Sequence, residues 1–152
     1  MKNMLNDIKE RVTLAREKEI KGKFVSAFYM GNLEKVEWQV DFFEEGKIHS
    51  LLPDGNVKED KLFGKEELKE LNLDEVKIDL IHALQKVEKI RDEKYEGMEA
   101  NKVIVILQRT ENVIWNVTWL TSNFKVFNVK VDAVSGEVLR ENCESIMGFK
   151  KN

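Results

Sequence analysis

Apolar positions near the start of the chain follow the period of an α-helix. They recur at spacings of three and four, with charged residues between them, at Leu5, Ile8, Val12 and Ala15. Such spacing places apolar side chains on one side of a helix. The next segment, KFVSAFYM at 23–30, is rich in aromatic and β-branched residues, which favour a β-strand. A helix followed by a strand is therefore predicted.

Strict alternation then begins in VEWQVDFF, residues 36–43. Apolar side chains alternate with Glu37, Gln39 and Asp41, as in an antiparallel strand with one buried face. Glu45-Gly46 predicts a hairpin turn into KIHSLL, residues 47–52, which ends before Pro53. The first unit is therefore predicted to be α-β-β-β.

The second part of the chain repeats this order. A helix is predicted from the N-cap residue Asp79 to a point before Gly97. Strands are predicted at 102–110, 113–120 and 124–134, with a last short strand at 137–140. We interpret this unit as α-β-β-β as well. The continuous apolar run at 103–107 indicates a central strand buried on both faces.

The two units share a register of aromatic and apolar positions. An offset of 77 residues relates Trp38 to Trp115, Val40 to Val117, and Phe42 to Trp119. This register indicates an internal duplication, although alternation within strands can also produce it. The predicted organisation is a first half, a charged connector, a second half and a C-terminal tail within one compact unit, at 1–57, 58–74, 75–145 and 146–152.

Part of the second half resembles the PepSY domain. The resemblance covers residues 79–140 and rests on the helical ALQKV, the W-x-V-x-aromatic strand and the segment VDAVSGEVL. The closing residues of the motif are Asp132, Ala133, Ser135, Gly136 and Glu137. The first half keeps only Trp38, Val40, Asp54 and Gly55.

The resemblance implies an α+β fold of two tandem cystatin-like, PepSY-like halves. In it, each helix would lie across its own curved antiparallel sheet, with the tandem copies packed as one unit. The family is associated with regulation of peptidases and with the cell envelope, and it offers no catalytic residues to carry over. This chain differs because it shows no signal peptide or anchor.

Composition limits the classes of function. The chain has 42% hydrophobic and 35% charged residues, which is typical of a globular protein. Its 25 basic and 28 acidic residues are interspersed, so no basic surface for nucleic acid is predicted. No apolar stretch is long enough to cross a membrane. We therefore expect a cytoplasmic location and no membrane insertion.

Reactive side chains do not form a recognisable motif. His49 and His82 have no metal-ligand spacing, and His49 is expected to face solvent. Cys143, the only cysteine, has no flanking nucleophile motif, and Ser135 lies in a predicted turn. We therefore predict that the protein has no catalytic residue, cofactor or metal and that it is not an enzyme.

Acidic and aromatic residues also have structural interpretations. The acidic loop with Asp54, Asn56, Glu59 and Asp60 lacks the EF-hand ligand pattern. Asp132 and Glu137 flank a turn and are assigned to it. The tryptophans, which are Trp38, Trp115 and Trp119, fall on the apolar sides of strands and are predicted to be core residues.

These observations favour a non-catalytic protein-binding or regulatory module. Its partner is expected to be an unknown protein or a second copy of the chain. Binding would use an uncovered sheet edge or the tail residues Ile146, Met147 and Phe149. The alternative is a carrier of an apolar small molecule in a groove between helix and sheet, with a tryptophan touching the ligand.

Overall fold

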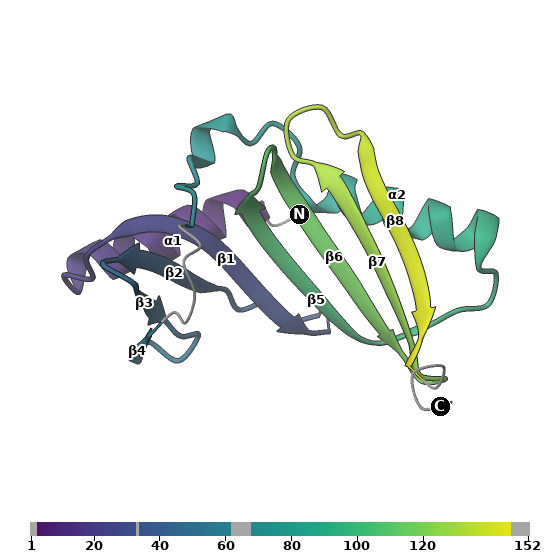
Figure 1. Cartoon of the computed structure of the whole chain (residues 1–152), viewed down its shortest axis with the longest axis horizontal. Helices are drawn as coiled ribbons and strands as arrows, with labels where there is room; N and C mark the ends of the chain where they lie inside the picture. The colour runs from purple at the N-terminus through teal and green to yellow at the C-terminus, as the bar shows by residue number, and fades with distance from the viewer. Residues whose placement is uncertain (1–2, 33, 62–67, 147–152) are drawn as a thin grey trace.

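The described residues fold into one antiparallel sheet of eight strands with two α-helices on one face (Figure 1). The structure is a computed structural model that describes residues 3–32, 34–61 and 68–146. In chain order its elements are α1 (Met4–Glu17), β1 (Lys23–Gly31), β2 (Gln39–Glu44), β3 (Lys47–Leu51), β4 (Val57–Lys61), the 3-10 helix η1 (Leu73–Glu75), α2 (Leu80–Lys94), β5 (Ala100–Arg109), β6 (Val113–Thr121), β7 (Lys125–Asp132) and β8 (Val138–Ser145).

The prediction of two tandem α-β-β-β halves, each with its own sheet, is wrong. The strand order β4-β3-β2-β1-β5-β6-β7-β8 is continuous, and each long helix is followed by four strands. β1 and β5 pair antiparallel, from Ser26 opposite Gln108 to Gly31 opposite Val103. Separate sheets would leave both strands as edges with unpaired backbone groups, and the β1–β5 pairing removes these two edges.

The two outermost strands were predicted incompletely. β4 begins at Val57, the last residue of the predicted first half, and its other residues lie in the segment 58–74 that was predicted to be a connector. β8 extends to Ser145 instead of ending at Arg140. Every side chain of β4 is exposed, and β8 carries mainly polar side chains. Both strands are held by backbone pairing to β3 and β7 rather than by an apolar face. Hydrophobic alternation therefore did not reveal them.

The two helices begin close to each other. The Asn3 side chain accepts hydrogen bonds from the N–H groups of Leu5 (3.0 Å) and Asn6 (3.3 Å), which caps α1. Asp79 occupies the N-cap position of α2, as predicted, but its side chain does not cap α2. Instead Asp79 Oδ1 accepts from the N–H of Leu5 at 3.3 Å. The Asp79 carboxylate thus links the starts of α1 and α2.

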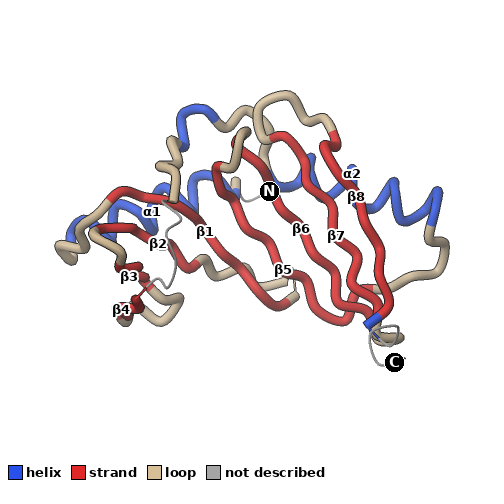
Figure 2. The backbone as a smooth tube through the Cα atoms, in the orientation of Figure 1, coloured by secondary structure: helices blue, strands red, loops and turns tan. Residues whose placement is uncertain are grey.

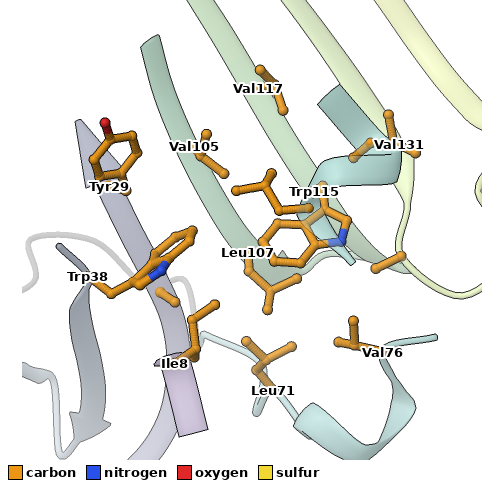
Figure 3. Packing of buried hydrophobic residues seen from close by; sticks show 14 of the residues in the cluster. Ile8, Tyr29, Trp38, Leu71, Val76, Val105, Leu107, Trp115, Val117 and Val131 are labelled. Atoms are coloured by element: carbon orange, nitrogen blue, oxygen red, sulfur yellow. The ribbon is translucent and has the colours of Figure 1, made fainter. Parts of the chain in front are cut away.

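The core lies between the helices and the sheet. Trp38, next to β2, and Trp115, in β6, are 2% and 0% exposed, and their ring centroids are 6.3 Å apart. Figure 3 shows these two indoles at the centre of the cluster, with Ile8 and Leu107 nearby. Trp115 Nε1 donates to the backbone oxygen of Ile78 at 2.7 Å. The predicted assignment of Trp38 and Trp115 to the core is confirmed, and so is that of Trp119, which is 7% exposed.

The second face of the sheet has no helix over it in the described part of the chain, and both helices lie behind the sheet in Figure 2. β5 is central, as predicted, and Val103, Val105 and Leu107 are buried on its helix-covered face. Its other face is only half-buried at Ile104 and Ile106, so the expectation of burial on both faces is wrong. The sheet is therefore asymmetric, with one packed face and one open face.

Candidate functional site

The reactive side chains singled out from the sequence do not converge. His49 lies on β3 near one edge of the sheet, and Cys143 lies on β8 at the opposite edge. His49 is half-buried and pairs with the core residue Phe42, which corrects the expectation that it faces solvent. His82 is exposed on α2. Within the described ranges, no three His, Cys, Asp or Glu residues lie close enough to hold a metal ion.

Residues of the second turn hold the turn itself. The Asp132 carboxylate accepts hydrogen bonds from the N–H groups of Val134 (2.7 Å) and Ser135 (3.0 Å). Ser135 Oγ accepts from the N–H of Glu137 at 3.1 Å. These bonds form a side-chain-supported turn, in which Ser135 Oγ acts as a hydrogen-bond acceptor. The structural interpretation of Asp132 and Ser135 is confirmed.

The acidic loop is also internally paired. Asp54 accepts from the backbone N–H and from Nδ2 of Asn56, each at 2.9 Å. Glu59 pairs with Lys47 at 3.0 Å, and Asp60 pairs with Lys58 at 3.2 Å. These contacts spread the carboxylates over a loop and a strand instead of directing them at one point.

The space between helices and sheet is filled with side chains. The cluster there includes Trp38, Trp115, Phe42 and Phe127, each no more than 2% exposed. A hollow of about 240 Å³ does reach Trp38, but it opens to solvent beside α1, and Arg11 and Pro53 are among its lining residues. A carrier site needs roughly 300 Å³ or more of largely enclosed space. The packing gives no support to a ligand groove between helix and sheet.

The two sheet edges differ strongly. β4 has five residues, all exposed, and carries Lys58 and Lys61. The ion pairs between Lys58 and Asp60 and between Lys47 and Glu59 place further charged side chains at this edge. Short strands with exposed lysines discourage another strand from pairing. The β4 edge is therefore protected against strand addition.

β8 is a longer edge and contains no lysine. It runs for eight residues, Val138–Ser145, and Leu139 is 44% exposed near its start. Ile146, which directly follows the strand, is 39% exposed. The two other tail residues proposed for binding, Met147 and Phe149, lie outside the described residues. Of the two edges, β8 thus carries fewer of the features that prevent strand addition.

Hydrogen bonding shows which backbone groups of β8 are unused by β7. The Ile146 N–H donates to the Phe124 oxygen at 2.7 Å, so Ile146 faces β7. Backbone groups on a strand alternate in direction, and the β7–β8 register is regular from Lys130 to Lys125. The N–H and C=O groups of Glu141, Cys143 and Ser145 therefore point away from the sheet. They form a row of donors and acceptors at the open edge.

The middle of β8 is held in place from the helix side. The Glu141 carboxylate accepts hydrogen bonds from Lys94 Nζ (2.5 Å) and the Tyr95 hydroxyl (3.1 Å) at the end of α2. The Lys94 ammonium holds the pKa of Glu141 below its usual value, and the Tyr95 hydrogen bond acts in the same direction. Cys143 packs against the core cluster. The exposed edge is thus a fixed template rather than a frayed strand.

Sequence reasoning singled out Cys143 for its thiol and missed the importance of its backbone. The available signal was the lysine-free segment VLRENCES after a turn, in which most residues are charged or polar. That signal points to an edge strand only when the neighbouring strand is known. The sequence led us to expect binding at an uncovered sheet edge, but it did not identify the strand that forms this edge.

Comparison with known proteins adds information about the fold. No protein family and no curated protein matches the sequence. One solved structure, described as a "putative lipoprotein" from Clostridium difficile 630, is similar with a TM-score of 0.62 and 15% sequence identity. The match covers 90% of this chain and 92% of that chain. The similarity therefore extends over nearly the whole of both chains and concerns the fold alone. No helix in the described part of the chain is long and apolar enough to span a membrane.

Proposed function

We propose that this protein is a non-catalytic binding or regulatory module that takes up an extended segment of a partner along β8. The observation that carries this proposal is the outward row of backbone groups at Glu141, Cys143 and Ser145. An added strand would satisfy these donors and acceptors through main-chain hydrogen bonds, which supply affinity with little dependence on sequence.

Side chains beside this row would supply selectivity. Arg140, Asn142 and Glu144 lie on the open face because they pair with Lys130, Asn128 and Val126 of β7. Their mixed charges favour a partner strand with complementary charges at alternate positions. Exposed Leu139 and Ile146 add apolar contact near the two ends of the strand. The partner is therefore expected to be a polar, amphipathic strand rather than a wholly apolar one.

A proline at position 143 tests the proposal. The Cys143 N–H makes no bond to β7, so Cys143→Pro removes an outward donor and blocks the edge while the β7–β8 ladder stays intact. Cys143→Ser is the matched control because it keeps the N–H. In affinity capture with the full chain, we expect a partner to be retained by the wild type and by Cys143→Ser and to be lost by Cys143→Pro.

Two measurements are needed to interpret the capture result, because loss of binding is informative only if the proline variant is folded. The far-UV circular dichroism and the thermal midpoint of Cys143→Pro establish that the variant is folded. If the folded proline variant still binds everything that the wild type binds, including a second copy of the chain, the β8 edge is not the binding site and the proposal is wrong.

The peptidase-regulating role implied by the PepSY resemblance is one form of this proposal. It gains support if the captured partner is a peptidase. The internal duplication also stays a prediction, supported by Trp38 and Trp115, which are 77 positions apart and meet in the core. The cytoplasmic location stays a prediction that cell fractionation would test.

A further inference from the structure

We propose that the partner of the β8 edge is β8 of a second copy of this chain. The two strands would run antiparallel about a two-fold axis at Asn142, so that two eight-stranded sheets join into one. This inference rests on the proposed function, because it uses the same outward backbone groups. It adds the identity of the partner and the register of the contact.

The backbone allows only a few central registers. Hydrogen-bonded pairs must form between the outward residues Glu141, Cys143 and Ser145, so the axis can pass through Glu141, Asn142 or Cys143. An axis at Glu141 would place two carboxylates directly opposite each other, which is unfavourable. An axis at Cys143 would place Arg140 opposite Ile146 of the second copy and leave its charge unpaired.

An axis at Asn142 instead places Arg140 opposite Glu144 of the second copy. The two-fold symmetry repeats this pair, so the contact gains two cross-strand ion pairs, both on the open face of the joined sheet. These positions form non-hydrogen-bonded pairs, in which facing side chains lie closest. The pattern of β8 is thus complementary to itself in one register.

Arg140 lacks an ion-pair partner in the described part of its own chain. It lies opposite Lys130 in the β7–β8 register, and cations in this position repel each other. No ion pair to Arg140 is present among residues 3–32, 34–61 and 68–146. Glu144 accepts one hydrogen bond, from Asn142 Nδ2 at 3.1 Å. Glu144 of a second copy would neutralise the excess positive charge at Arg140.

A polar row on the open face leads to the same axis. Thr118, Asn128 and Asn142 are paired in register across β6, β7 and β8. Asn128 Nδ2 donates to Thr118 Oγ1 at 2.8 Å. With the axis at Asn142, this row continues into the second copy through a pair of asparagine side chains, which can donate and accept hydrogen bonds mutually.

The ends of the strand also match in this register. Antiparallel pairing brings the start of one β8 to the end of the other. Exposed Leu139 then lies close to the end of β8 of the second copy, near its Ser145 and Ile146. The apolar surface at both ends of the contact is partly removed from water, which favours association.

Charge reversal tests this register. The full chain is studied by sedimentation over roughly a hundredfold range of concentration, where the wild type should shift from monomer to dimer. Arg140→Glu and Glu144→Arg each replace two attractions by two repulsions, and each should weaken dimerisation by about tenfold or more. The double variant Arg140→Glu/Glu144→Arg restores opposite charges and should recover dimerisation. Arg140→Glu also removes the repulsion from Lys130, so loss of the fold is not expected.

A disulfide tests the axis directly. In a Cys143→Ser background, Asn142→Cys places two thiols across the axis at a Cα separation of about 4.5 Å, within the range of a disulfide. Mild oxidation should therefore link this variant into dimers. The wild-type Cys143 lies opposite Glu141 of the second copy and should not become linked.

The outcomes separate this inference from the proposed function. A wild type that stays monomeric at every concentration, or a double variant that does not recover, overturns the self-pairing. If capture of a different protein is then still lost in Cys143→Pro, the β8 edge binds a foreign strand and the proposed function stands. Linkage of wild-type Cys143 under mild oxidation would overturn the register.

Discussion

The two core tryptophans occupy similar environments but differ in hydrogen bonding. Trp115 Nε1 donates to the Ile78 oxygen, whereas Trp38 Nε1 is buried and has no hydrogen-bond partner among the residues that the structure describes. Replacement of Trp115 by phenylalanine removes ring volume and also leaves the Ile78 oxygen without this donor. Replacement of Trp38 removes ring volume together with an unpaired polar group, whose burial is itself unfavourable.

We therefore expect Trp115→Phe to lower the free energy of unfolding by about 1 kcal/mol more than Trp38→Phe does. Urea denaturation of both variants, followed by far-UV circular dichroism, measures this difference. Equal losses would mean that the Trp115 hydrogen bond contributes nothing net, and a larger loss at Trp38 would contradict the prediction.

Glu141 gives the edge strand a dependence on pH. Its pKa is lowered in the folded protein, mainly by Lys94, so it binds a proton more readily in the unfolded chain. The carboxylate therefore stabilises the fold above the unfolded pKa of about 4.3, and this contribution is lost as the pH falls through the lower folded pKa. The effect is expected to be small because Lys94 is 57% exposed.

Comparison with Glu141→Gln checks this sign. The wild type should have the higher urea midpoint at pH 7, and the difference should shrink towards about pH 3. Lys94→Gln should show the same trend, because it removes the other member of the ion pair. A difference that stays constant with pH would show that the charge of Glu141 is not responsible.

Among the secondary-structure elements, the local pattern of hydrophobic residues predicted the inner strands of the sheet but not the full extent of the two edge strands. The strands β2 and β6 were recognisable because Val40, Phe42, Trp115 and Val117 alternate with polar residues and bury one face. β4 could not be recognised, because an edge strand held by backbone pairing needs no apolar alternation, and its sequence VKEDK has none. The C-terminal part of β8 was missed for the same reason. The candidate site lies in that missed part.

The local pattern of hydrophobic residues could not predict the β1–β5 pairing, for a different reason. Ala27 and Leu107 are opposite each other in the sheet but lie 80 residues apart in the chain. Each strand alone is compatible with an edge or a central position, and the choice depends on which other strands are available. Only the continuous apolar run in β5 indicated a central strand, and it did not name the neighbour.

At the scale of the whole molecule, the single sheet implies that both parts of the chain unfold together. The β1–β5 ladder and the contact of Trp38 with Trp115 cross the boundary between the parts. A loss of stability in one part should therefore be felt equally in the other, as expected for a cooperative two-state unit.

Val40→Ala tests this coupling because Val40 is 0% exposed on β2, in the first part of the chain. In a Trp38→Phe background, the remaining tryptophans, Trp115 and Trp119, both report from β6 in the second part. Loss of two buried methyl groups should cost about 2 kcal/mol. We expect the tryptophan fluorescence and the far-UV circular dichroism to shift to the same lower urea midpoint. If the fluorescence midpoint stayed unchanged while the circular dichroism showed an earlier transition, the two parts would unfold independently, and the β1–β5 ladder would not couple them.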